Sequence, residues 1–523
     1  MKTQSPDQSF NFAQFVIDIN SSRPDKVAFI DDSRQITYAE LASNIRRFAS
    51  ALSSLNIQQE QRVLLVMLDT IDLPVAFLGC LYAGVVPVVV NTLLQSSDYA
   101  YMLGHSHARA VFVSDALYPN IKKTLQINSK KPEADIPVII SGDATSATPG
   151  VASFSSLLEK HTEQAEPAET HRDDIAFWLY SSGSTGRPKG TVHTHANLYW
   201  SAELYGKQTL QIRETDITFS AAKLFFAYGL GNGLTFPLSV GATCILMSER
   251  PTAEAIFERL TVHKPTLFFG APTLYASMLA SPQLPDRSEM NLRACVSAGE
   301  SLPEALGTRF TDHFKCQILD GIGSTEMLHI YISNTHEDVH YGTTGKPVPG
   351  YEIELRDAQG LPVPQDTIGD LYVRGPTAAL MYWTNREKSR STFLGDWTKT
   401  GDKFICNEQG YYIYSGRSDD MMKISGQYVS PIEVEATLMS HDAVLECAVV
   451  GKPDDAGLLK AHAYIILKEE REASDDLAKE LQQFVKARLT PHKYPRYIHF
   501  VAELPKTATG KIQRFKLRAE IDG

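Results

Sequence analysis

The sequence of 523 residues predicts an α/β fold, with a large N-terminal domain built from layers of β-sheets and helices and a small α+β domain at the C-terminus. Three observations lead to this prediction. The chain is longer than one hydrophobic core usually supports, which indicates two or more domains. Short apolar runs alternate with segments of helical periodicity in the N-terminal part, as in parallel βα units. After Ser430, strand-like runs surround one amphipathic helix.

The N-terminal elements follow from local patterns. Thr37 and Glu40 form a T-x-x-E capping box, and apolar residues then recur at helical spacing from Leu41 to Leu52. A second helix is expected over residues 73–82. Apolar runs that predict buried strands lie at 63–68, 85–90, 111–114, 138–141 and 175–180.

The C-terminal domain begins with another helix start. Ser430 and Glu433 form a capping box, and Pro431 occupies the first helical position. Strands are expected at 443–450, 463–467 and 498–502. The intervening helix has apolar residues at helical spacing, namely Leu477, Leu481, Phe484, Val485 and Leu489.

Composition excludes several classes of protein. The formal net charge of −11 argues against a nucleic-acid binder held by a general basic field. The six cysteines form no C-x-x-C pair, which makes zinc and redox motifs poor interpretations and fits a reduced, cytoplasmic setting. Residues 1–10 contain no signal-peptide core. The most membrane-like run, 77–90, is short and is interrupted by Gly84 and Pro87, so no membrane span is expected.

A loop rich in glycine and hydroxyl groups follows the strand at 175–180. Glycines let backbone N–H groups approach an anion closely, hydroxyls add donors, and a lysine adds a point charge. A phosphate-binding loop is therefore favoured over a flexible linker, although the Walker A spacing is absent. Its candidate ligands are Ser181, Ser182, Gly183, Ser184, Thr185, Gly186 and Lys189.

An H-x-H pair, His193 and His195, comes shortly after this loop. Such a pair can bind a metal ion, but no third ligand with suitable spacing is evident. Structural hydrogen bonding is the favoured interpretation of both histidines.

The loop resembles the signature loop of the adenylate-forming acyl-activating enzymes, which include acyl-CoA synthetases, aryl-CoA ligases, luciferases and the adenylation domains of peptide synthetases. Other motifs of that family recur in order, at 223–230, 297–300, 320–326, 400–402, 414–420 and 505–514. The segments F-F-A-Y-G-L-G-N and D-G-I-G-S-T-E-M-L-H most resemble benzoate–CoA ligases and their hydroxybenzoate relatives.

The resemblance implies an ATP site. Thr325 would contact the α-phosphate, and Glu326 would hold Mg²⁺ through a carboxylate oxygen, as a hard cation requires. Ile322 stands where the family commonly has a tyrosine, so it would contact adenine by dispersion alone. Asp402 would accept hydrogen bonds from both ribose hydroxyls. The expected ATP ligands outside the loop are Gly299, Glu300, Asp320, Gly321, Ile322, Thr325, Asp402 and Arg417.

The same resemblance implies an acyl pocket beside this site. Phe226 would also stand at the gate of the coenzyme A channel, at a position where the family usually has a histidine. No acid occupies this position to pair with a buried ammonium, which disfavours an amino-acid substrate. His329 either bonds a ring substituent or is a core histidine satisfied internally. The expected pocket residues are Phe226, Ala227, Tyr228, Gly323, His329 and Ile330.

The family's C-terminal domain is mobile, and its motifs imply the same here. By resemblance Lys511 is the catalytic lysine, Asp419 the hinge, and Gly426 a residue of the coenzyme A channel. The implied domains are 1–416, which binds ATP and the acid, and 417–523, which carries the lysine. Lys511, Thr325 and Glu326 form the expected catalytic set.

The predicted function is that of an aromatic-acid–CoA ligase that uses ATP, Mg²⁺ and coenzyme A, with benzoate as the first choice of acid. Hydroxybenzoate, other small aryl or heteroaryl acids, and a stand-alone adenylation enzyme that loads a carrier protein are the alternatives. A luciferase-like oxidase that acts on the adenylate is a further alternative, and oxygen consumption would reveal it. A homodimer is possible, because dimers are common among the relatives.

Overall fold

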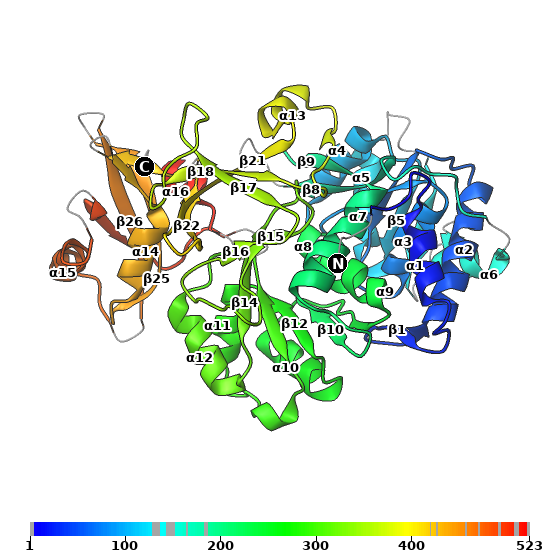
Figure 1. Cartoon of the computed structure of the whole chain (residues 1–523), viewed down its shortest axis with the longest axis horizontal. Coiled ribbons are helices and arrows are strands. Elements are labelled where there is room, and N and C mark those ends of the chain that lie inside the picture. Colours follow the sequence, from blue (N-terminus) through cyan, green and yellow to red (C-terminus); the bar gives the residue numbers. More distant parts are fainter. Residues whose placement is uncertain are drawn as a thin grey trace. The chain divides into compact units, whose positions relative to one another are not determined.

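A computed structural model describes residues 5–127, 136–142, 152–163, 166–181, 187–418, 420–424, 427–454, 458–468, 471–489, 493–506 and 512–519. The chain divides into two compact units (Figure 1). The first comprises Met1–Glu352 and Val373–Thr398, and the second comprises Ile353–Tyr372 and Lys399–Gly523.

One sheet of the first unit has eight strands in the order β19-β9-β8-β4-β3-β5-β6-β7. Pairing is parallel from β8 through β7 and antiparallel at β9 and β19. Strands β3, β4 and β5 are buried at nearly every position, which explains their continuous apolar runs. The expected strands are confirmed, with ends that shift by a residue or two. The bounds are β3 (Arg62–Val66), β4 (Val86–Val89), β5 (Val111–Ser114), β6 (Val138–Ser141), β7 (Ala152–Ser153), β8 (Ile175–Ser181), β9 (Lys189–Thr194) and β19 (Met381–Tyr382).

The other large sheet has nine strands in the order β16-β15-β14-β13-β12-β10-β11-β1-β2. Its central strands are parallel, and β15 turns back antiparallel to β14. The connection between β14 and β15 carries the G-S-T-E-M-L-H segment. The bounds are β1 (Val27–Ile30), β2 (Gln35–Thr37), β10 (Ile217–Ser220), β11 (Thr243–Ile245), β12 (Leu267–Gly270), β13 (Ala294–Ser297), β14 (Ile318–Gly323), β15 (Ile330–Ser333) and β16 (Lys346–Pro347).

Helices pack against these sheets, and α2 illustrates why they form. The Thr37 side chain accepts the N–H of Glu40, and the Glu40 carboxylate accepts the N–H of Thr37, so the expected capping box is confirmed. Phe48 on the buried face of α2 packs against Phe112 of the sheet, with ring centroids 5.0 Å apart. The helices of this unit are α1 (Phe12–Asn20), α2 (Tyr38–Ser54), α3 (Asp72–Tyr82), α4 (Ser96–Ser106), α5 (Tyr118–Ile127), α6 (Phe154–Lys160), α7 (His195–Ser201), α8 (Ala227–Leu230), α9 (Phe236–Val240), α10 (Ala253–Val262), α11 (Pro272–Ala280), α12 (Glu304–Phe314) and α13 (Arg386–Thr392).

The second unit contains most of a five-stranded sheet, a two-stranded ribbon and a three-stranded sheet. The three-stranded sheet and α15 are the elements predicted from residue 443 onward. The bounds are β17 (Glu352–Arg356), β18 (Gly369–Arg374), β20 (Phe393–Leu394), β21 (Trp397–Cys406), β22 (Tyr412–Arg417), β23 (Met422–Ile424), β24 (Gln427–Val429), β25 (Val444–Pro453), β26 (Leu459–Leu467), β27 (Tyr497–Phe500), α14 (Pro431–Met439), α15 (Asp475–Lys486) and α16 (Arg514–Ala519).

Only half of the capping box predicted at Ser430 forms. The Ser430 hydroxyl accepts the N–H of Glu433 at 3.2 Å. The Glu433 carboxylate does not return to the cap, because it binds the Lys493 ammonium at 2.7 Å. The mixed helix–sheet architecture with a large N-terminal part and a small C-terminal part is nevertheless the predicted fold class.

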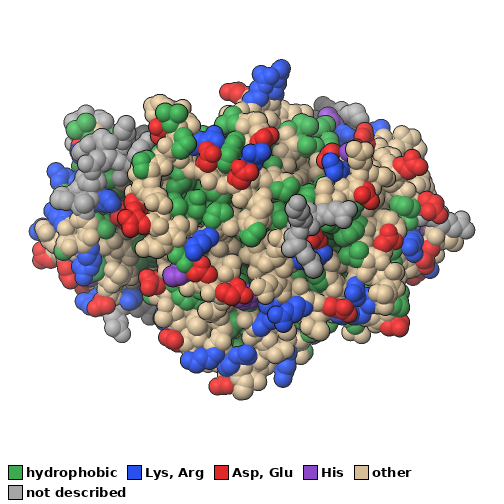
Figure 2. Space-filling model, viewed as in Figure 1, with side chains coloured by type: hydrophobic (Ala, Val, Ile, Leu, Met, Phe, Trp, Pro, Cys, Tyr) green, Lys and Arg blue, Asp and Glu red, His purple; other side chains and the backbone are tan. Residues whose placement is uncertain are grey.

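Charges of both signs are interspersed on the face drawn in Figure 2, in agreement with the absence of a general basic field. Among the described residues, no helix is both long and apolar enough to cross a membrane.

Candidate active site

The connection after β14 holds Thr325, and a buried histidine supports it from β9. The Nε2–H of His193 donates to the Thr325 carbonyl at 2.8 Å, and its Nδ1 lies 3.1 Å from Asn197 Oδ1. Burial lowers the pKa of His193 to about 4, so the ring is neutral near pH 7. These contacts agree with the structural interpretation of the H-x-H pair. Through its hydrogen bond to the Thr325 carbonyl, His193 stabilises the connection after β14.

Glu326 and Lys189 both contact Tyr382 of β19. The Tyr382 hydroxyl donates to Glu326 Oε1 at 2.7 Å, and the Lys189 ammonium lies 4.5 Å from the centre of the Tyr382 ring. A cation and a carboxylate are thereby held around one tyrosine. Such a pair suits a phosphate chain that carries a divalent cation.

The groups near Glu326 fit a magnesium ion that is also bound by substrate phosphates better than a metal ion held by protein side chains alone. No group of three or more His, Cys, Asp or Glu in the described ranges could hold a metal ion. Mg²⁺ is usually bound by one or two carboxylates together with substrate phosphates and water. Glu326 can serve as such a carboxylate, since the Tyr382 hydrogen bond engages only Oε1.

The described ends of the phosphate loop are Ser181, which ends β8, and Lys189, which begins β9 and pairs with it. His105 of α4 braces this region, because its Nδ1 lies 2.7 Å from the Tyr180 hydroxyl and its Nε2 lies 2.8 Å from Thr384 Oγ1. Five predicted ligands lie outside the described residues, namely Ser182, Gly183, Ser184, Thr185 and Gly186.

His329 is held in one tautomer by two acceptors. Its Nε2 lies 3.1 Å from Asn232 Oδ1 and 3.3 Å from the Tyr228 carbonyl, so Nε2 carries the hydrogen. Burial lowers the pKa of His329 to about 3, which keeps the ring neutral. Its Nδ1 is buried without a hydrogen-bond partner among the described atoms. His329 therefore presents one unused acceptor.

Aromatic rings enclose His329. The ring of Phe236 lies 4.5 Å away between centroids, and those of Tyr205 and Tyr228 lie at 5.1 and 5.6 Å. A Cβ atom at Gly231, in the π-helical turn between α8 and α9, would lie 2.3 Å from the His329 ring, so this position requires glycine.

The other expected acyl-pocket residues flank this cluster. Gly323 ends β14, where an added Cβ would lie 2.5 Å from the His329 carbonyl oxygen, and Ile330 opens β15. Ala227 begins α8, and Phe226 caps it with its ring 4.5 Å from that of Phe225. The gating role of Phe226 stays a prediction.

Asp320 lies on β14 with an unused acceptor. Burial raises the pKa of this carboxyl well above its usual range, and its Oδ1 has no hydrogen-bond partner within the described part of the chain. Because buried polar atoms are nearly always satisfied, a ligand that donates a hydrogen bond fits here. Gly299 adopts a φ of 95° in the turn that precedes Glu300, and Gly321 and Ile322 continue β14.

The second unit holds the expected ribose ligands. Asp402 of β21 faces Arg417 of β22, with Oδ1 2.9 Å from Nη1. Gly401 has a φ of 79°, and an added Cβ would lie 2.9 Å from Arg417 Nη2. Lys511, Asp419 and Gly426 lie outside the described residues, so their assigned roles stay predictions.

Sequence reasoning missed the residues that support the site. Tyr382 and Asn232 are remote in sequence from Glu326 and His329, and no local pattern marks them. A structural role was predicted for His193, but not its partner, the Thr325 carbonyl, which is remote in sequence.

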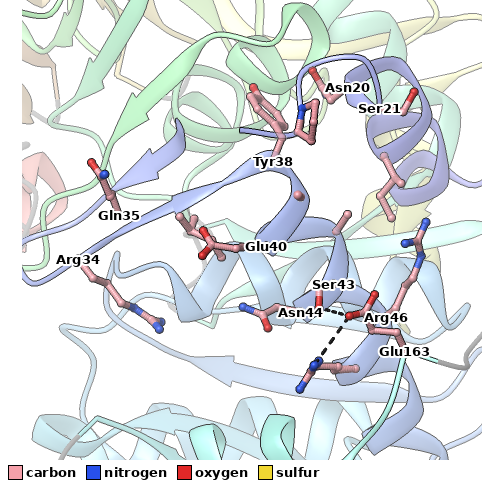
Figure 3. Close-up of a pocket in the computed structure, with 16 residues that line it drawn as sticks. Asn20, Ser21, Arg34, Gln35, Tyr38, Glu40, Ser43, Asn44, Arg46 and Glu163 are labelled. Carbon is pink, nitrogen blue, oxygen red and sulfur yellow. Dashed lines mark hydrogen bonds and ion pairs between the residues drawn. The ribbon is translucent and has the colours of Figure 1, made fainter. Parts of the chain in front are cut away.

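A groove of about 840 Å³ lies apart from these residues, between α2, β2 and the end of α1 (Figure 3). Its charges are largely compensated, because Ser43 donates to Glu163, Arg47 lies 3.8 Å from Glu163, and Arg34 pairs with Asp72. None of the predicted ligands lines this groove.

Protonation of buried His195 is expected to destabilise the protein in acid. Its Nδ1 accepts the N–H of Phe12 at 3.3 Å, and burial lowers its pKa to about 4. A depressed pKa contributes stability above pH 6.5 that is lost as the pH falls towards 4, roughly 2 kcal/mol between pH 7 and pH 5. Denaturant unfolding at both pH values should show a loss smaller by about that amount in His195→Gln. Equal losses in the two proteins would contradict this.

Comparison with known proteins places these sites in a family. The model of the AMP-binding enzyme family matches residues 18–383, and that of the AMP-binding enzyme C-terminal domain matches residues 433–511. A benzoate–CoA ligase of Thauera aromatica is 54% identical over 516 residues, which are 98% of this chain and 96% of that protein. A 4-hydroxybenzoate–CoA/benzoate–CoA ligase of Rhodopseudomonas palustris is 45% identical over 98% of this chain and 94% of that protein.

Solved structures agree with this placement. A benzoate CoA ligase from Burkholderia xenovorans is 60% identical, with a TM-score of 0.90 over 97% of this chain and all of that one. An anthranilate CoA ligase in complex with anthranoyl-AMP is 40% identical, with a TM-score of 0.91 over 98% of each chain. The resemblance inferred from the motifs is confirmed, and the chain belongs to the family of AMP-binding enzymes.

Proposed function

We propose that the chain joins benzoate to coenzyme A at the expense of ATP, through a benzoyl-adenylate, and releases AMP and pyrophosphate. The observation that carries this proposal is the 54% identity to a benzoate–CoA ligase over nearly the full length of both chains. The enzyme is thus an AMP-forming acid–thiol ligase. No enzyme nucleophile is needed, because AMP is itself a good leaving group.

In the first half-reaction, a benzoate oxygen attacks the α-phosphorus of ATP, and the bond from that phosphorus to the β-phosphate oxygen breaks. Lys511 stabilises the negative charge that develops between the carboxylate and the phosphate. Thr325, Lys189 and the phosphate loop hold the phosphates, and Glu326 holds Mg²⁺. When bound there, the ion would supply positive charge that stabilises the pyrophosphate leaving group.

The nucleotide can donate hydrogen bonds to Asp320 and to Asp402. The amino group of adenine can donate to Asp320 Oδ1, which otherwise has no partner among the described atoms. The ribose hydroxyls can donate to Asp402, whose position is fixed by Arg417 at 2.9 Å. Asp320 thereby gains the hydrogen bond that makes the burial of its Oδ1 tolerable.

In the second half-reaction, residues 417–523 rotate about Asp419, which withdraws Lys511 and brings Gly426 to the thiol channel beside Phe226. The coenzyme A sulfur attacks the acyl carbon as its proton is lost, and the acyl–oxygen bond to AMP breaks. One fold thus supplies two active sites in succession. The cytoplasmic location and the homodimer stay predictions beside this scheme.

The aromatic cluster around His329 supports the proposal of a small aromatic acid. Three aromatic rings lie within 5.6 Å of its imidazole between centroids, and Gly231 leaves no room for a larger side chain there. Flat rings gain from such stacking and edge contacts. Phe226 stands where an acid would be needed to pair with a buried ammonium, which disfavours amino acids.

Hydroxybenzoate is the second candidate, and the unused Nδ1 of His329 favours it. A ring hydroxyl is a donor that this acceptor could bind, whereas benzoate offers none. A panel of benzoate, 4-hydroxybenzoate, anthranilate and a medium-chain fatty acid, each supplied with ATP, Mg²⁺ and coenzyme A, tests the assignment through AMP release. We expect benzoate to give the highest kcat/KM. A preference for the fatty acid would overturn the aryl assignment.

The same panel separates the reaction types. A free coenzyme A thioester is expected as the product. An acyl-adenylate that reacts only with a carrier protein would instead support the stand-alone adenylation enzyme, and benzoate-dependent oxygen consumption would support an oxidase.

Replacing His329 with leucine should change selectivity among aromatic acids. If Nδ1 binds the ring hydroxyl, His329→Leu lowers the ratio of kcat/KM for 4-hydroxybenzoate over benzoate by ~10-fold, the value of one buried hydrogen bond. Asn232→Ala is the control, because it removes the bond that orients the ring but leaves the acceptor. An unchanged ratio in His329→Leu would mean that the histidine is a core residue without a substrate contact.

A further inference from the structure

A buried carboxylate, Asp370 of β18, holds two segments of the second unit together, and the proposed steps do not use it. The Lys403 ammonium donates to Asp370 Oδ1 at 2.8 Å, and the Ser418 hydroxyl donates to the same oxygen at 2.7 Å. The Lys399 ammonium lies 3.3 Å from Asp370 Oδ2. The side chains of Asp370 and Lys403 are each 10% exposed, so this ion pair is largely withdrawn from water.

The two residues that Asp370 anchors stand directly beside the expected ribose ligands. Lys403 follows Asp402 on β21. Ser418 follows Arg417, which ends β22. Asp402 and Arg417 are register partners in the antiparallel pairing of these strands, and their side chains meet at 2.9 Å. One carboxylate on β18 thus holds both strands at the level of the Asp402–Arg417 pair.

The backbone of β18 supports Asp402 as well. The N–H of Asp402 donates to Thr400 Oγ1 at 3.1 Å. The Thr400 hydroxyl in turn donates to the carbonyl of Leu371, the residue after Asp370, at 3.3 Å. Arg417 Nη1 donates to the Thr400 carbonyl at 3.2 Å. The turn that carries Asp402 is therefore connected both to β18 and to Arg417.

Asp370 is anionic at neutral pH although it is buried. Burial would raise the pKa of its carboxyl, but the hydrogen bonds from Lys403 and Ser418 and the charge of Lys403 hold that pKa below its usual value. A buried ion pair is tolerated only when its geometry is good, and removal of one partner leaves the other charge uncompensated. Asp370 therefore sets the position of the Lys403 side chain.

We infer that Asp370 is a positioning residue for the ribose of ATP. Through Lys403 and Ser418 it holds the strands beside Asp402, so that the Asp402 carboxylate lies where both ribose hydroxyls can donate to it. This inference rests on the proposed function, because it assumes that ATP is bound and that Asp402 accepts these hydroxyls. A hydrogen bond weakens steeply when its acceptor is displaced or turned. Loss of Asp370 should consequently weaken recognition of the ribose before it affects recognition of benzoate.

The test compares ATP with 2′-deoxyATP in benzoate-dependent pyrophosphate exchange by the full-length protein. The unchanged protein should prefer ATP by ~10- to 100-fold in kcat/KM, because 2′-deoxyATP leaves one hydrogen bond to a buried carboxylate unmade. Asp370→Asn keeps the shape of the side chain but removes the charge that holds Lys403. It should raise KM for ATP by ~10-fold with KM for benzoate nearly unchanged, and lower the preference for ATP by ~5-fold. A role confined to the stability of the fold would weaken the use of both nucleotides alike and leave the preference unchanged.

Ser418→Ala is the second variant, because it removes one hydrogen bond to Asp370 without leaving a buried charge unpaired. The preference for ATP should fall in the same direction, by about 2- to 3-fold. If Asp370→Asn folds poorly by its Tm, Ser418→Ala decides.

Lys493→Gln is the matched control. It removes another ion pair of the second unit, the one with Glu433 at 2.7 Å, which shares no residue with the contacts of Asp370. KM for ATP and the preference over 2′-deoxyATP should both stay unchanged. A preference that is unchanged in Asp370→Asn and Ser418→Ala, or that falls equally in Lys493→Gln, would overturn the inference.

An Asp402→Ala variant separates the levels of the argument, because it removes both acceptor oxygens and should abolish most of the preference for ATP. No preference in the unchanged protein, or a preference that survives in Asp402→Ala, would refute the assigned ribose ligand and this inference with it. Loss of preference in Asp402→Ala beside full preference in Asp370→Asn and Ser418→Ala would refute the positioning role alone. Absence of benzoate-dependent exchange in the unchanged protein would instead refute the proposed function, on which the inference depends.

Discussion

Lys511→Ala is expected to slow benzoyl-adenylate formation by ~10²- to 10³-fold while thioester formation from supplied benzoyl-adenylate stays nearly unchanged. The reason is that charge develops on the carboxylate and phosphate oxygens only in the first half-reaction, and a preorganised cation there is worth this much. Benzoate-dependent exchange of pyrophosphate into ATP measures the first step, and coenzyme A thioester formation measures the second.

Asp419→Pro provides the reciprocal result. Proline restricts the backbone at the expected pivot, so the domain should remain in its adenylating arrangement and the second half-reaction should be lost. Equal losses of both half-reactions in Lys511→Ala, or an unaffected second half-reaction in Asp419→Pro, would contradict the alternation of the C-terminal domain.

Glu326→Gln is expected to lower adenylation on the order of 10²-fold at a fixed Mg²⁺ concentration and to raise the Mg²⁺ concentration needed for half-maximal rate. The substitution replaces the carboxylate that would bind Mg²⁺ with a neutral amide of nearly the same shape, so the negative charge is lost while the packing of the side chain is kept. Titration of adenylation with Mg²⁺, after chelator treatment, measures both changes.

Tyr382→Phe is the matched control for Glu326→Gln. It removes the hydroxyl that donates to Glu326 at 2.7 Å but keeps the carboxylate and the ring beneath Lys189. Its effect should be smaller, on the order of tenfold, because it loosens the ligand without removing it. A Mg²⁺ requirement that is identical in Glu326→Gln and the unchanged protein would exclude Glu326 as the metal ligand.

Local patterns were sufficient for much of the fold. The capping box at Thr37 and the apolar runs of β3, β4 and β5 predicted their elements, because each depends on residues that are neighbours in sequence. Helix α11 was not among the predicted elements, although it begins at Pro272 and has proline at its first position, where proline is favoured.

The sequence predicted those residues of the candidate site that lie together in a short motif. It did not predict residues that reach the site only through long-range strand pairing. Thr325 and Glu326 belong to one short segment, so a motif marks them. Tyr382 reaches Glu326 only because β19 pairs with β9 in the eight-stranded sheet, a long-range pairing that no local pattern contains. The chain passes between the two compact units after residues 352, 372 and 398. The domain boundary between residues 416 and 417, which the resemblance implies for the rotating C-terminal domain, stays a proposal.

Transfer of oxygen from benzoate to AMP tests the central claim most directly. Benzoate labelled with ¹⁸O in its carboxylate is incubated with the enzyme, ATP, Mg²⁺ and coenzyme A, and the AMP and pyrophosphate are analysed by mass spectrometry. Attack of the carboxylate on the α-phosphorus predicts that each AMP released carries one labelled oxygen and that pyrophosphate carries none. Unlabelled AMP formed together with benzoyl-CoA would contradict an acyl-adenylate intermediate.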